Sequence, residues 1–348
     1  MESYAFPGNI DQYIMEIGAQ PFMYMRTDAF SEINKESERI LLDLIHCSGG
    51  RTIIYTGSGT GAMAAVVENY VSTKQKAFVV DGGSFGHRWY EMCRYYDIPA
   101  VDYRVPFACD IDYDDLEAQI ERERPDVFLC QHHETSSGQL FDLARISAIC
   151  RQHRVSLVVD VISTFLAEEL NMDALGIDIC ITSTQKGLNI PPGLSIIFLG
   201  RALEGYPFRH RGYYWDFASN LDNLRRGQTP FSPATILYLQ LNARLRQLQA
   251  EGGELQNISE VRHRAQVFRT HCRKYGWDIP AENPSSAITG FQTSDNEERR
   301  IFKRLMTDFA TYIMPSGREG FYRVSHMGLQ TDEALARLAE RIHLIEVS

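Results

Sequence analysis

Short apolar runs alternate with amphipathic segments from about residue 50 to about residue 200. The apolar runs are continuous and rich in β-branched residues, which is typical of strands covered on both faces. The segments between them have the apolar spacing of helices with one buried face. The resulting βαβα order predicts an α/β domain with a mainly parallel sheet. Strands are expected at residues 52–56, 76–81, 126–131, 155–160, 177–182 and 194–200, and helices at 61–71, 87–96, 112–123 and 143–153.

The pattern changes after about residue 225. The segments 234–253 and 257–274 read as long helices, the first of which ends at a pair of glycines. Two short strand-like runs, "AITGFQT" and "FYRVSHMG", and a final helix over 332–347 follow. This mixture predicts a smaller α+β unit. We therefore divide the chain into an N-terminal segment, a large α/β domain and a small C-terminal α+β domain, over residues 1–20, 21–235 and 236–348.

Composition narrows the class of protein. The 348 residues carry a net charge of −10, which argues against a general affinity for nucleic acid or for anionic membranes. The seven cysteines are dispersed without a CxxC pair, as expected for free thiols in a reducing compartment. The N-terminus lacks the pattern of a signal peptide, and no apolar run reaches the roughly 20 residues of a membrane span. We expect a cytoplasmic protein.

A glycine-rich loop, "YTGSGTGAM", joins the first predicted strand to the first helix. Its backbone N–H groups and the hydroxyls of Ser58 and Thr60 form a candidate phosphate cradle at a helix N-terminus. A tight turn that requires small residues is the alternative structural interpretation. The G-x-G-x-x-A spacing that begins at Gly57 also fits a dinucleotide fingerprint, with Asp81 at the end of the next strand.

Two further residues follow strands of the predicted sheet. Asp160 ends the run "VSLVVD", and a carboxylate there suits a metal ligand, a ribose binder, a partner of a protonated ring nitrogen or a capping residue. Lys186 lies between two apolar runs in "ITSTQKGLNIPPGLSIIFLG". A buried lysine can lose its proton and form a Schiff base, whereas a lone lysine is usually a surface residue. Together with the phosphate cradle, these residues are the parts that hold pyridoxal phosphate.

Other candidate motifs are weaker. The segment "CQHHET" offers His132, His133 and Glu134, but neither an HExxH spacing nor a cysteine pair accompanies them, so we predict no metal site. The aromatic run "RGYYWDF" suits a substrate pocket, the core or a dimer interface. Arg323 lies in the apolar run "FYRVSH", where its charge needs either an acidic neighbour or a substrate carboxylate.

The segment "DVISTFLAEELNMDALGIDICITSTQKGLNIPPGLSIIF" closely resembles the central motif of the class V pyridoxal-phosphate aminotransferases. This family includes alanine–glyoxylate, serine–glyoxylate and 2-aminoethylphosphonate–pyruvate aminotransferases. The resemblance covers about residues 50 to 200 and returns near the C-terminus. It implies a fold type I transferase that binds pyridoxal 5'-phosphate and forms a homodimer with shared active sites.

The resemblance also implies roles for individual residues. Lys186 corresponds to the Schiff-base lysine, Asp160 to the partner of the pyridinium nitrogen, and Arg323 to the arginine that binds the substrate carboxylate. The N-terminal segment, with Gly8 in "FPGN", corresponds to one wall of the substrate pocket, although the family's Gly-Pro-Gly-Pro-like stretch is only partly present. Thr229 corresponds to a phosphate contact supplied by the partner subunit. The other cofactor-binding positions implied are Ser58, Gly59, Thr60, Phe85, Thr135, Ile162 and Gln185.

The function implied is transfer of an amino group from a small amino acid or amino-phosphonate to a 2-oxo acid such as pyruvate or glyoxylate. A pyridoxal-phosphate lyase of the same fold, either a desulfurase or a phosphonate-processing enzyme, is the first alternative. The region after residue 300 contains no cysteine, which counts against a desulfurase. A NAD-dependent dehydrogenase, based on the glycine loop and Asp81, is the second alternative.

Overall fold

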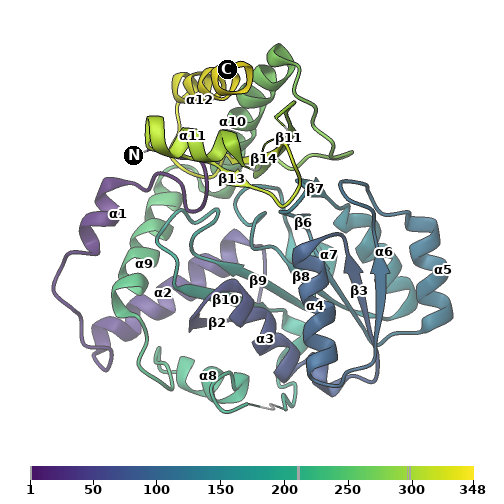
Figure 1. Ribbon diagram of the computed structural model, residues 1–348. Coiled ribbons are helices and arrows are strands. Elements are labelled where there is room, and N and C mark those ends of the chain that lie inside the picture. Colours follow the sequence, from purple (N-terminus) through teal and green to yellow (C-terminus); the bar gives the residue numbers. More distant parts are fainter. Residues whose placement is uncertain (1, 210–211, 296, 298) are drawn as a thin grey trace.

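The computed structural model describes residues 2–209, 212–295, 297 and 299–348. Arg211, which opens the aromatic run, lies outside this part of the chain. A seven-stranded sheet forms the centre of a large unit, and a smaller unit rests on one edge of it (Figure 1). In spatial order the strands are β2 (Arg51–Thr56), β10 (Leu194–Leu199), β9 (Ile179–Ser183), β8 (Ser156–Asp160), β5 (Val127–Gln131), β3 (Ala77–Asp81) and β4 (Ala100–Arg104).

The sheet is mainly parallel, as predicted. Strand β10 is antiparallel to both of its neighbours, β2 and β9, whereas the pairs from β9 to β4 are all parallel. The sequence analysis missed β4. This strand has a single neighbour, β3, and its residues are mostly half-buried and include charged side chains. An edge strand of this kind lacks the continuous apolar run by which the other strands were recognised.

Helices cover both faces of the large sheet because successive side chains of each strand point to opposite faces. On β3, Ala77 and Val79 pack into the core beneath helices α3 and α4, and Phe78 and Val80 pack into the opposite core. Helices α2, α5, α6 and α9 contribute to that second core. The helices of the large unit are α1 (Gln12–Ile17), α2 (Asp28–Leu44), α3 (Gly59–Asn69), α4 (Ser84–Tyr95), α5 (Tyr113–Glu123), α6 (Leu143–His153), α7 (Met172–Leu175), α8 (Phe217–Leu224) and α9 (Thr235–Ala250).

Local sequence signals set several of the helix boundaries. Asp112 and Asp142 are the N-caps of α5 and α6, and each carboxylate accepts hydrogen bonds from two backbone N–H groups of the first turn. Gly276 ends α10 (Gly253–Tyr275) in the left-handed conformation that glycine adopts without strain. The helices predicted at 234–253 and 257–274 correspond to α9 and α10, but the break between them falls at residues 250–253, a few residues earlier than predicted.

The small unit has its own core. Its three-stranded antiparallel sheet contains β11 (Ile288–Gln292), β14 (Phe321–Ser325) and β13 (Met314–Pro315), and helices α10, α11 (Arg300–Phe309) and α12 (Asp332–Val347) pack beside it. The N-terminus joins this unit, since β1 (Glu2–Ser3) pairs with β12 (Thr311–Tyr312) and Tyr4 is fully buried. The division at 235/236 remains a prediction, and α9 packs against α2 in the core of the large unit.

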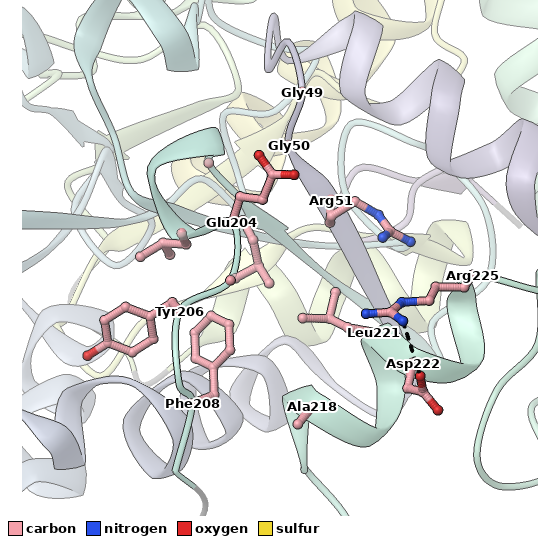
Figure 2. A pocket seen from close by; sticks show the side chains of 14 residues that line it. Gly49, Gly50, Arg51, Glu204, Tyr206, Phe208, Ala218, Leu221, Asp222 and Arg225 are labelled. Atoms are coloured by element: carbon pink, nitrogen blue, oxygen red, sulfur yellow. Dashed lines mark ion pairs between the residues drawn. The ribbon is translucent and has the colours of Figure 1, made fainter.

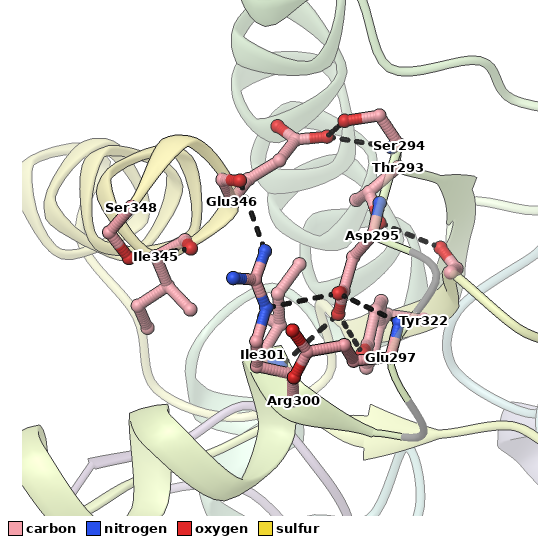
Figure 3. Close-up of polar contacts among 11 residues, drawn as sticks. Thr293, Ser294, Asp295, Glu297, Arg300, Ile301, Tyr322, Ile345, Glu346 and Ser348 are labelled. Carbon is pink, nitrogen blue, oxygen red and sulfur yellow. Dashed lines mark hydrogen bonds and ion pairs between the residues drawn. The ribbon is translucent and has the colours of Figure 1, made fainter.

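A buried carboxylate ties the loop before α11 to the rest of the small unit (Figure 3). The side chain of Asp295 is fully buried and accepts hydrogen bonds from Arg300 Nε at 3.1 Å and from the Tyr322 hydroxyl at 2.9 Å. Glu346, near the C-terminal end of α12, accepts hydrogen bonds from Trp277 Nε1 and from Ser294. These contacts join α11, α12 and β14, which fixes the strand that carries Arg323. Within the described part of the chain, every helix is too short or too polar to cross a membrane.

Candidate active site

Most of the residues singled out by sequence lie at one edge of the large sheet. Strands β2, β3, β5, β8 and β9 run in the same direction, so their carboxyl ends meet there. In open α/β sheets this edge is where ligands bind. The residues that follow these five strands include Ser58, Gly59, Thr60, Phe85, Thr135, Asp160, Ile162, Gln185 and Lys186.

Lys186 and Asp160 form a buried pair of opposite charge. Their relative exposures are 8% and 6%. Burial lowers the pKa of Lys186 to about 7, against the opposing attraction of Asp160. Burial likewise raises the pKa of Asp160 to about 7, although a hydrogen bond from the Ile162 N–H and the charge of Lys186 both act to lower it. A lysine amine with this pKa is neutral in about half of the molecules at pH 7, and in that form it is a nucleophile and a base.

The glycine loop leads into α3 beside these two residues. Ser58 is the N-cap, but its side chain makes no capping hydrogen bond and its hydroxyl remains available for a ligand. A Cβ atom on Gly59 would lie 2.5 Å from Ile162 Cδ1, so a larger residue here would force the Ile162 side chain or the loop to move. A helix N-terminus with a free hydroxyl suits an anionic group such as phosphate.

An arginine that the sequence analysis did not single out connects the loop to α4. Arg88 Nη1 donates to Thr60 Oγ1 at 2.9 Å, and its guanidinium lies 5.1 Å from the centroid of the Phe85 ring. Its charge also acts to lower the pKa of Asp160. Arg88 therefore adds positive charge to the side of the site where a phosphate would lie.

Glu134 sets the position of Phe85. This fully buried carboxylate accepts hydrogen bonds from the N–H groups of Phe85 and Gly86 and from Gln131 Nε2. Burial raises the pKa of Glu134, whereas its bonds to Ser136 act to lower it. The carboxylate thus joins the start of α4 to the short hairpin of β6 (His133–Glu134) and β7 (Gln139–Leu140).

The small unit contributes Arg323 from β14. Its Nη1 donates to the Thr135 carbonyl at 2.9 Å and its Nη2 to the Pro315 carbonyl at 2.8 Å, while Nε is buried without a hydrogen-bond partner. Within the described residues it makes no ion pair. Burial lowers the pKa of the guanidinium, against the opposing attraction of Glu134. A half-buried cation without a paired carboxylate favours an anionic ligand.

The N-terminal segment passes directly over the lysine. Lys186 Nζ lies 3.1 Å from the centroid of the Phe6 ring, and Asn189 Nδ2 donates to the Pro7 carbonyl at 2.7 Å. Gly8 has a φ of +82°, and a Cβ atom there would lie 2.9 Å from Gly328 Cα. The segment therefore closes the site on the side of Lys186. Sequence indicated this wall through Gly8 but did not identify Phe6.

Several buried polar atoms at this edge have no hydrogen-bond partner in the described residues. They include Ser183 Oγ, Gln185 Oε1, His133 Nε2 and Arg323 Nε. Unsatisfied buried groups are costly, and a cluster of them at one place indicates a missing polar ligand. Together with the free N-terminus of α3 and the pair Lys186 and Asp160, this donor set fits a phosphorylated cofactor with an aldehyde and a basic ring nitrogen.

The hydrogen bonds of Thr229 are made outside this cluster. Its hydroxyl donates to the Phe231 carbonyl at 2.7 Å, and its carbonyl accepts from Arg26 Nη1 at 2.7 Å. Large aromatic side chains near this segment are exposed: Tyr213 is 84%, Phe22 83% and Tyr24 64% exposed. The role predicted for Thr229 in a partner's site stays a prediction.

Asp81, the residue behind the dinucleotide alternative, has a different partner. Its carboxylate lies 2.7 Å from His87 Nδ1. With Asp102 of β4 these side chains bring three ligand-type atoms within 4.8 Å of one another, and Arg104 pairs with Asp102 at 2.7 Å. Arg104 offsets the charge of Asp102, and we assign this group no metal.

A cavity of about 440 Å³ lies at the edge of the large sheet opposite to the candidate active site (Figure 2). Figure 2 shows Tyr206 and Phe208 on one side of it, the charged side chains Arg51 and Arg225 on the other, and Leu221 between them. Since Arg51 begins β2, this cavity is on the edge of the sheet opposite to Ser58 and Lys186. It contains none of the residues that carry the chemistry described above.

Comparison with known proteins identifies the class. The model of the aminotransferase class-V family matches residues 9–230, more than half of the sequence, and the chain belongs to this family. It is therefore a pyridoxal-phosphate-dependent aminotransferase by family. The fold class and the resemblance predicted from sequence are confirmed, and the NAD-dependent dehydrogenase alternative is set aside.

Individual relatives extend over nearly the whole chain. The chain is 27% identical to the small subunit of a soluble hydrogenase from Synechococcus sp., covering 92% of this chain and 86% of the relative. It is 24% identical to L-aspartate–glyoxylate aminotransferase of Paracoccus denitrificans, covering 94% and 86%. Its structure is similar to that of alanine–glyoxylate aminotransferase from Nostoc sp., with a TM-score of 0.91, 20% identity and coverage of 97% and 93%.

Proposed function

We propose that this protein transfers an amino group from a small amino acid or amino-phosphonate to a 2-oxo acid such as glyoxylate or pyruvate. The relatives named for glyoxylate support the choice of acceptor. We further propose that it acts in the cytoplasm as a homodimer in which each active site contains residues of both subunits.

The observation that carries the proposal is the buried pair Lys186 and Asp160 at the carboxyl ends of adjacent parallel strands. Lys186 would hold the aldehyde of pyridoxal phosphate, and Asp160 would hold its ring nitrogen. The N-terminus of α3, with Ser58 and Thr60, would hold the phosphate. When bound, the cofactor supplies an electron sink for the substrate's α-carbon.

The chain's own residues then act on the substrate. The Nζ amine of Lys186, with a pKa of about 7, would take the proton from the α-carbon of the amino substrate and deliver it to the cofactor carbon on the other side of the amino nitrogen. Arg323 binds the α-carboxylate through its planar fork, which fixes the orientation of the α-carbon. Phe6 of the N-terminal segment covers Lys186 and excludes water from its amine.

The visible spectrum of the purified protein tests this proposal. We expect a yellow protein whose absorption band is lost on addition of an amino donor and restored by glyoxylate or pyruvate. Lys186→Ala should abolish the covalent attachment that gives this band. A protein that stays colourless when supplied with pyridoxal phosphate would refute the proposal, and one that is yellow but releases ammonia instead of transferring nitrogen would be a lyase.

A panel of donors then narrows the substrate. Small amino acids and 2-aminoethylphosphonate are added separately, and the rate at which the yellow band is lost is compared. Because Arg323 is a half-buried cation without an ion pair in the described residues, we expect donors with an α-carboxylate to react faster than the aminophosphonate, which lacks it.

A further inference from the structure

The buried histidine His133, at the same sheet edge, has one ring nitrogen without a hydrogen-bond partner in the described residues. His133 lies on β6, is 2% exposed, and its Nδ1 lies 2.8 Å from Ser163 Oγ. Its Nε2 is buried and has no hydrogen-bond partner in the described residues. The neighbouring His132 contacts Thr164 Oγ1 through Nδ1 at 3.1 Å, and its Nε2 is not among the unsatisfied buried atoms.

The hydrogen bonds around His133 favour one of its two neutral tautomers. Ser163 Oγ accepts from Thr135 Oγ1 at 3.2 Å, and its own hydroxyl hydrogen is available to donate to His133 Nδ1 at 2.8 Å. Burial, and then the charge of Lys186, lower the pKa of His133 well below its ordinary value, which keeps the ring neutral. When Ser163 donates to Nδ1, the neutral ring carries its hydrogen on Nε2. In this tautomer the unsatisfied Nε2 is a buried N–H donor.

The surroundings of this donor include a second unpaired N–H group. Lys186 and Arg323 both act on the His133 ring electrostatically. The Nη1 of Arg323 donates to the Thr135 carbonyl, close to His133 along the chain, and the Nε–H of Arg323 also has no partner in the described residues. Two unpaired N–H donors, one of them on a guanidinium, fit an anionic oxygen.

We propose that His133 is a substrate-binding residue whose Nε2–H donates to the α-carboxylate of the amino acid, alongside Arg323. This inference rests on the proposed function. The neutral ring adds a directional contact without adding charge, and so it helps to select ligands with a carboxylate oxygen at this position. A contact to an oxygen of the cofactor is the alternative outcome of the test.

Two substitutions test the roles of the two ring nitrogens of His133 separately. The amide of His133→Asn can keep a contact at the place of Nδ1 and removes the donor at Nε2. The longer side chain of His133→Gln brings an amide donor close to the place of Nε2. His132→Asn is the matched control, because it changes the adjacent buried histidine, whose ring contacts Thr164 instead of Ser163.

Two amines distinguish whether the oxygen that accepts the hydrogen bond of His133 belongs to the substrate carboxylate or to the cofactor. 2-Methylalanine carries a carboxylate but lacks an α-hydrogen, so it binds without being converted, and isopropylamine is its counterpart without the carboxylate. Each is titrated into the yellow protein, and the change of the visible band gives a dissociation constant. The cofactor affinity of each variant is measured separately from the same band.

We expect His133→Asn to weaken the binding of 2-methylalanine about tenfold, the usual effect of losing a hydrogen bond to a charged group. Isopropylamine binding and cofactor affinity should change little, His133→Gln should recover part of the loss, and His132→Asn should resemble the wild type. Unchanged 2-methylalanine binding would overturn the inference, as would an equal loss for both amines or a loss of cofactor affinity. A colourless wild-type protein would instead refute the proposed function.

Discussion

At the scale of single residues, the amine of Lys186 is the group most changed by its surroundings. An exposed lysine is charged at pH 7, whereas burial lowers the pKa of Lys186 from its ordinary value to about 7. An amine is neutral above its pKa. The neutral fraction of Lys186 therefore falls about tenfold for each unit of pH below 7.

This shift predicts how cofactor attachment depends on pH. When pyridoxal phosphate is added to the cofactor-free protein, the yellow band should appear faster as pH rises from 5 and should level off above about pH 7 to 8. Stopped-flow absorbance measures the rate. Asp160→Asn should move the plateau to lower pH, because the charge of Asp160 raises the pKa of Lys186. A rate that still rises above pH 9 would contradict the burial argument.

Arg323 gives a second prediction at this scale. Both Arg323→Ala and Arg323→Lys should raise KM for the amino acid and for the oxo acid at least tenfold, since a lysine cannot form the planar two-point contact with a carboxylate. Steady-state kinetics with each substrate varied in turn measures the effect. Arg318→Lys, on the exposed loop before β14, is the control. Unchanged KM values for both substrates in Arg323→Ala would show that Arg323 has only a structural role.

At the scale of elements, the approach of the glycine loop to the segment after β8 depends on one missing side chain. In Gly59→Ala the new Cβ atom would lie 2.5 Å from Ile162 Cδ1, so the start of α3 or the isoleucine has to move. Overpacking of this kind costs about 1–3 kcal/mol. The same displacement would disturb the N–H groups proposed to hold the phosphate.

We therefore expect Gly59→Ala to lower both the unfolding free energy and the affinity for pyridoxal phosphate. Denaturant titration measures the first quantity, and fluorescence titration of the cofactor-free protein measures the second. Gly317→Ala is the control, because a Cβ atom there meets nothing within 4 Å. Wild-type stability and affinity in Gly59→Ala would show that the loop is not confined as described.

At the scale of the whole molecule, the exposed aromatic surface near Thr229 fits a subunit interface. Tyr213 and Phe231 have ring centroids 5.7 Å apart, and Tyr213 is 84% exposed in the single chain. Exposed clusters of large apolar side chains are characteristic of interaction sites. We predict a dimer in sedimentation experiments at micromolar concentration.

Shared active sites lead to a stricter prediction. Lys186→Ala and Thr229→Ala should each have low activity, but mixing them under conditions of subunit exchange should restore part of it. Each mixed dimer would contain one site with both wild-type residues, because Lys186 and Thr229 of one site come from different subunits. If no activity returns although mixed dimers form, Thr229 acts within its own subunit or not at the site.

The sequence by itself determined the fold class, the family and the residues that follow the parallel strands. Asp160 and Lys186 were found because continuous apolar runs fix strand ends, and the carboxyl ends of parallel strands share one edge. The resemblance also indicated residues far along the chain, such as Arg323. These inferences depend on local patterns and on a specific motif, and both can be recognised along the sequence without knowledge of the tertiary structure.

The tertiary structure decided what surrounds those residues. Phe6 covers Lys186, Glu134 holds the start of α4, and His133 presents an unpaired N–H only because a hairpin, a helix and the N-terminal segment meet at one edge. The edge strand β4 also escaped the sequence pattern. The burial of a side chain, its tautomer and its counter-ion depend on neighbours that are distant along the chain, and no local pattern of residues encodes them.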